Sequence, residues 1–338
     1  MKLNTKTYEL NDVTIVQAPI AYTTHRGDVD NQVTICDRKV YPIFAAPMGA
    51  VIDENNYKTF IKNGITPVIP RTVGQRLSFE ERMELAKETF VSISLREAIY
   101  DARDYFENHQ DKYYICIDIA HGTLNELYTN CQILKHINPN IELMAGNVAN
   151  PDAYAFYAAA GISWMRVNIG SGHRCTSSAN VGIHYGTATL LDKLNEARKA
   201  YAHSHNGEAP TKLICDGGIA NFDDINKAIA LGADSVMIGK LFAECEEACG
   251  EIFEKDGQRC REYYGMSTRR AQRETGGEGN RTSEGISKPV EVKYPLAKWV
   301  DNMQSYLRSC MTYTNSRTIE ELQKNAQLVI CSDQQFRK

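Results

Sequence analysis

Eight short apolar runs alternate with longer amphipathic segments between about residues 41 and 250, and this alternation limits the fold more than any other feature. The runs are rich in Val and Ile and are bounded by Gly, Pro, Asp or Asn, as is typical of parallel strands buried on both faces. We expect strands at residues 42–46, 66–70, 90–94, 114–119, 141–145, 164–169, 212–215 and 235–238.

The segments between these runs have helical character. Asn150-Pro151 offers a cap followed by proline in the first turn, and Asn221 precedes acidic residues that suit the positive end of a helix. Eight strands alternating with helices predict a (β/α)8 TIM barrel. A doubly wound sheet is disfavoured because the first strand leads into 45–49, which is not the glycine-rich turn of a dinucleotide-binding fold. Helices are expected at 53–62, 78–87, 95–108, 123–136, 151–160, 187–203 and 221–231.

The organisation of the chain indicates a single domain over residues 1–338, without a linker-like stretch or an internal repeat. The barrel core is expected at about 41–250. A hairpin on the turn Asp256-Gly257 and a flap would occupy 251–295. A helical extension over 296–338 would contain helices at 296–309 and 318–324.

Composition excludes several classes of protein. The chain is 43% hydrophobic and carries a net charge of −4, so a large core is expected and a nucleic-acid partner is not. The N-terminus lacks the apolar segment of a signal peptide, and no run approaches the roughly 18 apolar residues of a membrane span. We therefore expect a cytoplasmic protein that does not associate with membranes. The ten cysteines occur singly, which predicts small buried side chains rather than a zinc site.

Residues with chemical potential follow the later strands, at the barrel end where function is expected. Asp118 and His121 follow the fourth strand, and Asn147 follows the fifth. Cys175 follows the sixth, after a glycine-rich turn whose N–H groups, with Arg174, favour a thiolate. A small loop side chain and ordinary loop polar groups are the structural alternatives.

The seventh and eighth strands end in Asp216-Gly217-Gly218 and Gly239-Lys240. Backbone N–H groups at these neighbouring ends could hold a phosphate, and Asp216 could bind a pair of ribose hydroxyls. Glycines are also common wherever a turn needs a left-handed backbone. Together the two ends suggest a nucleotide beside Cys175.

These motifs, in this order, resemble the IMP dehydrogenase and GMP reductase family. The resemblance runs from about Tyr8 to Leu322. It implies a homotetrameric enzyme that binds a purine mononucleotide and a nicotinamide cofactor, and whose cysteine forms a covalent thioimidate at purine C2. The matching stretches are Gly170-x-Gly-x-x-Cys175-Thr176, Asp216-Gly-Gly-Ile219, Ala233-Asp-Ser-Val-Met-Ile-Gly239, Ala46-Pro47-Met48, Asp118-Ile-Ala-His-Gly122, Ala145-Gly-Asn-Val148, Tyr264-Gly-Met-Ser267 and Ser283-Glu-Gly285.

Three features favour the reductase branch. Residues 71–90 leave no room for the regulatory CBS domains of dehydrogenases, and segment 268–282 lacks the Arg-Tyr pair of their flap. The stretches 264–267 and 281–285 resemble the purine-contacting loops of reductases. The resemblance thus implies NADPH-dependent reductive deamination of GMP to IMP and ammonia. The alternatives are an IMP dehydrogenase without regulatory domains, a reductase-like enzyme acting on a modified purine nucleotide, and a non-catalytic nucleotide-binding protein.

By this resemblance Cys175 is the nucleophile, and Ser177 with Glu284 handles the proton for the departing ammonia. A monovalent cation such as K⁺ would lie at Gly170, Gly172 and Cys175, and no other metal is expected. The substrate would contact Met48, Gly172, His173, Asp216, Gly217, Gly218, Gly239, Lys240, Met266, Ser267, Arg281, Ser283 and Gly285. NADPH would lie along Asp118, Ala120, His121, Gly122 and Asn147.

The chain also departs from the family pattern. Ser177 replaces a threonine, and His173 and Lys240 stand where the family carries other residues near the phosphate. Two larger basic side chains would crowd the usual pocket or serve a different phosphate arrangement. Pro47 is dehydrogenase-like, and Gly49 replaces a polar residue. These departures keep a modified purine nucleotide open as the substrate.

Overall fold

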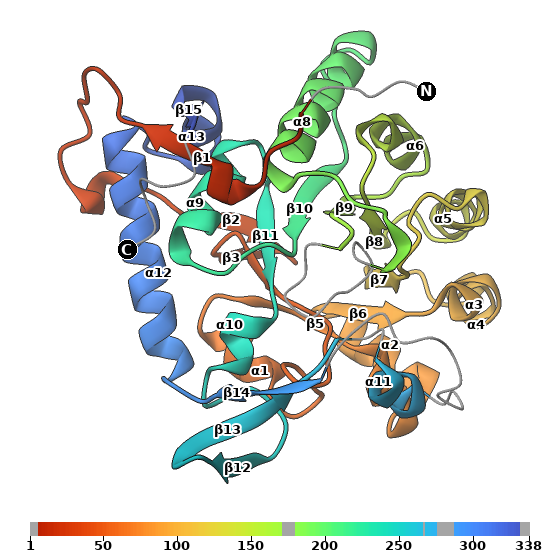
Figure 1. Cartoon of the computed structure of the whole chain (residues 1–338). Coiled ribbons are helices and arrows are strands. Elements are labelled where there is room, and N and C mark those ends of the chain that lie inside the picture. The colour runs from red at the N-terminus through yellow and green to blue at the C-terminus, as the bar shows by residue number, and fades with distance from the viewer. Residues whose placement is uncertain (1–5, 171–179, 266–267, 276–286, 332–338) are drawn as a thin grey trace.

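The computed structural model describes residues 6–170, 180–265, 268–275 and 287–331. Eight parallel strands close into a barrel in the order β10-β11-β4-β5-β6-β7-β8-β9. Neighbouring strands follow one another in the chain, and closure comes from pairing of β11 (Ser235–Ile238) with β4 (Ile43–Ala45). The predicted TIM barrel is confirmed (Figure 1).

The barrel strands lie close to the expected apolar runs. The largest difference is at β8, which continues beyond its expected end at residue 145 to Val148. A register shift between Gly146 and Val148 accompanies this extension and carries Asn147 along the wall. The other strands are β5 (Thr66–Ile69), β6 (Phe90–Ile93), β7 (Tyr114–Asp118), β8 (Glu142–Val148), β9 (Trp164–Val167) and β10 (Lys212–Asp216).

Helices surround the barrel (Figure 1), and each of the seven expected between the strands is present, whereas α10 and the turns η1, η2 and η3 were not predicted. Ser78 and Ser94 begin two of them with capping boxes, each accepting from a backbone N–H three residues later. The single helix expected over 95–108 is divided at Tyr100. The helices are α1 (Tyr57–Lys62), α2 (Phe79–Ala86), α3 (Leu95–Ile99), α4 (Asp101–Glu107), α5 (Asn125–Ile137), α6 (Tyr154–Ala159), α8 (Thr187–Ser204), α9 (Phe222–Ala230) and α10 (Lys240–Ala243), with 3-10 turns η1 (Leu10–Asp12), η2 (Arg26–Asp28), η3 (Arg71–Gln75) and η4 (Pro151–Ala153).

Aromatic side chains fill the barrel interior. The ring of Phe44 meets those of Phe90 and Trp164 edge-on, at centroid distances of 5.8 and 5.2 Å. A hairpin of β2 (Val33–Ile35) and β3 (Arg38–Val40) packs against the same cluster. Its turn residue Asp37 contacts Tyr114 at the start of β7, which places the hairpin at the amino ends of the strands. The carboxyl ends are therefore the end at which a site can form.

Further elements complete the molecule. The hairpin predicted on Asp256-Gly257 is present, and both turn residues have positive φ, as its two-residue turn requires. Three features were not predicted: a third strand on this hairpin, a helix inside the expected flap, and the pairing of β1 with β15. These elements are β12 (Ile252–Lys255), β13 (Gln258–Tyr263), β14 (Lys288–Glu291), α11 (Arg269–Glu274), α12 (Leu296–Tyr313), α13 (Ile319–Asn325), β1 (Val13–Val16) and β15 (Gln327–Ile330).

Two expectations from composition can be compared with the described residues. Within them, no helix has both the length and the apolar character needed to cross a bilayer, and no group of three His, Cys, Asp or Glu side chains is placed to hold a metal ion. Most described cysteines are buried and all are unpaired, as expected. The buried ones are Cys36, Cys116, Cys131, Cys215, Cys245 and Cys260.

We predict that Phe44→Ala destabilises the barrel by about 3–5 kcal/mol, because it empties the centre of the aromatic cluster. Urea unfolding followed by circular dichroism measures the change. Phe156→Ala is the matched control, since that ring is 60% exposed, and it should cost about 1 kcal/mol or less. Equal effects of the two substitutions would contradict the packing described above.

Candidate functional site

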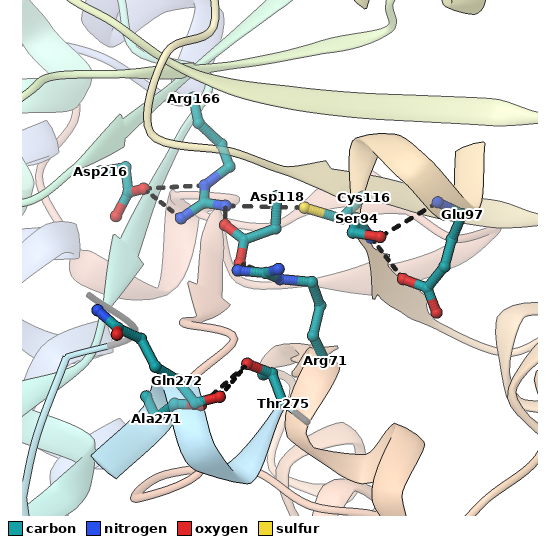
Figure 2. Close-up of polar contacts among 10 residues, drawn as sticks. All are labelled: Arg71, Ser94, Glu97, Cys116, Asp118, Arg166, Asp216, Ala271, Gln272 and Thr275. Atoms are coloured by element: carbon teal, nitrogen blue, oxygen red, sulfur yellow. Dashed lines mark hydrogen bonds and ion pairs between the residues drawn. The ribbon is translucent and has the colours of Figure 1, made fainter. Parts of the chain in front are cut away.

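A buried arginine joins two carboxylates at the carboxyl ends of the strands. Arg166 belongs to β9 and is only 7% exposed. Its Nη1 donates to Oδ1 of Asp118 at 2.5 Å, while Nη2 and Nε lie 2.8 and 2.9 Å from Oδ2 of Asp216 (Figure 2). Asp118 ends β7 and Asp216 ends β10, so one guanidinium connects three barrel strands.

Two more side chains extend this group. Arg71, the first residue of η3 after β5, places Nε 3.4 Å from Oδ2 of Asp118 (Figure 2). Asn147 donates from Nδ2 to Oδ2 of Asp216 at 2.8 Å. Positive and negative charges thus alternate from Arg71 through Asp118 and Arg166 to Asp216. Buried charges are tolerated when they are paired and hydrogen-bonded in this way.

The pairing determines the ionisation of these groups. Burial alone would raise the pKa of Asp118, but Arg166 and Arg71 outweigh it and lower that pKa. Burial opposes the charge of Arg166, yet Asp216 and Asp118 hold its pKa well above the ordinary value. Asp118 is therefore an acceptor rather than a proton donor near neutral pH. The nearby Cys116 remains a thiol, because burial raises its pKa to about 11.

The segment after β7 lies beside the end of β8. Asn147 donates from its N–H to the Ile119 carbonyl at 2.8 Å and accepts from the Gly122 N–H at 2.9 Å. A Cβ atom on Gly122 would lie 2.6 Å from the Asn147 carbonyl oxygen, so glycine is required there. His121 is exposed, and its Nδ1 is 3.2 Å from Oγ1 of Thr123. His121 therefore stays outside the charge network, whereas Gly122 contacts Asn147 through its backbone and Ala120 is exposed.

A second group of predicted residues lies where β11 meets β4. A Cβ atom on Gly239 would lie 2.7 Å from Oη of Tyr263 and 2.9 Å from Sδ of Met48. Lys240 begins α10, and its Nζ is 3.5 Å from Oε1 of Glu244, the C-cap residue of that helix. The charge of Lys240 is thus met by a carboxylate at the end of α10.

The glycines after β10 have the left-handed backbone that the sequence suggested. Gly217 and Gly218 have φ of 104° and 79°, a region that residues with a Cβ atom rarely adopt. Gly170, after β9, also has a positive φ of 81°. The other predicted site residues lie outside the described residues: Gly172, His173, Cys175, Ser177, Met266, Ser267, Arg281, Ser283, Glu284 and Gly285.

Sequence reasoning missed several residues near these groups. Arg166 carried a usable signal, because a charge inside a doubly buried strand needs a partner. Tyr264 donates from its hydroxyl to Oε2 of Glu274 on α11 at 2.8 Å. A Cβ atom on Gly49 would lie 3.1 Å from that hydroxyl. The glycine at 49, noted as a departure, therefore leaves room for the Tyr264–Glu274 contact.

We predict that Arg166→Met costs about 3–5 kcal/mol at pH 7, because it leaves the buried carboxylate of Asp118 and the partly buried carboxylate of Asp216 without their main partner. In the wild type the low pKa of Asp118 stabilises the fold at pH values above about 3.9, the pKa of an aspartate in the unfolded chain. This stabilisation is lost as the pH falls through the lower pKa that Asp118 has in the folded protein. In the variant, burial raises that pKa, so acidification protonates Asp118 and relieves the penalty. The two proteins should therefore differ less in their free energy of unfolding, measured in urea, as the pH is lowered from 7 toward 4.

The control for this prediction is Arg76→Met. Arg76 is half-exposed and pairs with Glu54 on the surface, so its loss should cost about 1 kcal/mol or less. A stability difference between wild type and Arg166→Met that stays constant with pH would contradict the proposed ionisation of the network.

Comparison with known proteins places the chain in a family. The model of the IMP dehydrogenase / GMP reductase domain matches residues 91–338. A GMP reductase of Clostridium acetobutylicum is 32% identical over 320 residues, which is 93% of each chain. A GMP reductase of Photobacterium profundum is 30% identical over 301 residues, 87% of this chain and 84% of that one. An inosine-5'-monophosphate dehydrogenase of Chlorobaculum parvum is 34% identical over 227 residues, 64% of this chain and 44% of that one.

The family match includes β7, β9 and β10, whose carboxyl ends carry the charge network. With a closed barrel of eight parallel strands and relatives that match it nearly end to end, this chain belongs to the IMP dehydrogenase / GMP reductase family.

Proposed function

We propose that the protein is an NADPH-dependent GMP reductase that converts GMP to IMP and ammonia. The observation that carries this proposal is coverage: the match to the Clostridium GMP reductase spans 93% of both chains, whereas the dehydrogenase match spans 44% of that longer protein. The connection from β5 to β6 supports it, because it contains only η3 and α2 and no inserted domain.

Asp216 is the proposed acceptor for the ribose hydroxyls. Arg166 and Asn147 both donate to its Oδ2, and no described residue donates to Oδ1. The described residues thus hold the carboxylate through Oδ2, and Oδ1 is the oxygen proposed to accept from a substrate. The N–H groups after β10 and β11, at Gly217, Gly218 and Gly239, are the proposed phosphate contacts.

The residues proposed to hold NADPH suit a nicotinamide nucleotide chemically. Asp118 offers an ionised acceptor and Asn147 offers amide groups, while Gly122 allows the chain after β7 to pack closely against Asn147. Ala120 and exposed His121 would continue this surface. Bound NADPH would supply the hydride that reaches purine C2. A homotetramer and a K⁺ ion at the Cys175 loop stay predictions of the resemblance.

In the proposed reaction the thiolate of Cys175 attacks C2 of GMP and forms a carbon–sulfur bond. Ser177 and Glu284 deliver the proton with which the 2-amino group departs as ammonia, leaving a thioimidate. Addition of hydride at C2 then breaks the carbon–sulfur bond, so that IMP leaves and the thiolate is restored. The overall balance is GMP, NADPH and two protons giving IMP, ammonium and NADP⁺.

The activity can be tested directly with the purified protein. GMP with NADPH should lower the absorbance at 340 nm, with one ammonium and one IMP formed for each NADPH consumed. Formation of NADH from IMP and NAD⁺ would instead identify a dehydrogenase. A protein that binds GMP but turns over neither mixture would contradict the reductase and point to a modified purine nucleotide or a binding protein.

We predict that Cys175→Ala lowers kcat at least roughly a thousandfold, because the covalent route is lost. Its affinity for GMP, measured by calorimetry, should change little, since Asp216 and the glycine N–H groups remain. Cys310→Ala, a half-buried cysteine on α12, is the control and should keep full activity. Substantial GMP turnover by Cys175→Ala would exclude the thioimidate route.

A further inference from the structure

The described residues on the two sides of the segment that contains Cys175 lie close together at the end of β9. The segment begins after β9, and α8 begins at Thr187. Asn168, just after β9, donates from Nδ2 to Oγ1 of Thr187 at 3.2 Å. His184 places Nδ1 3.0 Å from the Ile169 carbonyl oxygen. Two contacts thus join the described ends of the segment.

The N-terminal part of the chain packs on the same place. Glu9 lies with Oε1 2.5 Å from Nε2 of His184, and its Oε2 accepts from the Thr187 N–H at 3.1 Å. The carbonyl of Tyr8 accepts from the next two N–H groups of α8. A Cβ atom on Gly186 would lie 2.7 Å from that carbonyl oxygen, so this approach requires glycine. Glu9 also gains from the positive end of the 18-residue helix α8.

The two partners of His184 define its protonation. A neutral imidazole has one N–H and one lone pair, so it can donate to only one of two acceptors. His184 faces acceptors from both nitrogens, a carbonyl at Ile169 and a carboxylate at Glu9. Only the imidazolium can donate to both. The neutral ring would turn a lone pair toward one of these oxygens.

The surroundings of His184 agree with a protonated ring. Among the described residues, Glu9 is the charged neighbour of His184. Two further titratable groups lie near Glu9: Asp12, which accepts from the Glu9 N–H, and the buried thiol of Cys215. Burial lowers the pKa of His184, but the Ile169 carbonyl and the Glu9 carboxylate outweigh it and raise that pKa above the ordinary value. The ring is therefore protonated through a wider range than a free histidine.

We propose that His184 is a positioning residue whose protonated ring joins the end of β9, the start of α8 and the N-terminal segment. The contacts of His184 with Ile169 and Glu9, here called the clasp, would thereby fix the two ends of the segment that contains Cys175. The proposal rests on the proposed function only in assigning the chemistry to Cys175. Because the pKa is raised, the clasp is fully present below about pH 6.5 and is lost as the pH rises through the folded value. Above that value kcat/KM for GMP should fall.

The test compares the wild type with Glu9→Gln, which keeps an acceptor for His184 but removes the charge. A histidine titration by NMR identifies the His184 signal by its absence in His184→Gln. We expect a wild-type pKa above 6.5 and a lower pKa in Glu9→Gln, because the variant lacks the carboxylate that favours the imidazolium. The alkaline limb of kcat/KM should move to lower pH by the same amount. His136→Gln, on the last turn of α5, is the control and should leave both curves unchanged.

A readout without turnover separates this proposal from the proposed function. Mass spectrometry measures the rate at which iodoacetamide alkylates Cys175. This rate should differ between wild type and Glu9→Gln at the pH values where His184 is protonated in the wild type but not in the variant. This difference is expected even if GMP proves not to be the substrate. A wild-type pKa at or below 6.5, or a lowered pKa without any change in alkylation rate, would overturn the positioning role.

Discussion

The guanidinium of Arg166 between Asp118 and Asp216 is the interaction on which the carboxyl end of the barrel depends. Removing these groups from water is costly, and the cost is offset only when each charge meets its partner at hydrogen-bond distance. Those distances exist because β7, β9 and β10 are held in register by the closed sheet. The barrel wall and the candidate site are therefore stabilised by the same contacts.

The contacts that stabilise this end of the barrel also fix the position of Asp216, the proposed ribose acceptor. The carboxylate of Asp216 is held from one side by Arg166 and Asn147, which both donate to its Oδ2, so its position is set by the protein itself. In the proposed role of Asp216, such preorganisation would spare a ligand the cost of ordering its acceptor. Arg71 extends the same effect to Asp118 from a fourth strand end. A flexible loop carboxylate would offer the same chemical group without this advantage.

The sequence predicted the barrel because its strands are buried on both faces and therefore appear as continuous apolar runs, as at Ser235–Ile238. Pairing between distant segments, such as Val13 with Ile330, has no local pattern and was missed. The meeting of Asp118, Asn147 and Asp216 at one end of the barrel could be predicted because strand ends are visible in the sequence. Arg166 was missed because it lies inside a strand, and the roles of Cys175 and Glu284 came from the resemblance rather than from the described geometry.

The pairing of β1 with β15 has a consequence for the growing polypeptide. Translation delivers Glu9 and β1 first, while the strand that pairs with β1 leaves the ribosome only near the other end of the chain. Until then the N-terminal segment can dock on α8 but has no partner strand on its far side. The contacts around His184 would thus be among the last parts of the protein to become firm, so that a nascent chain would hold a nearly finished barrel before its N-terminal segment is fixed against α8.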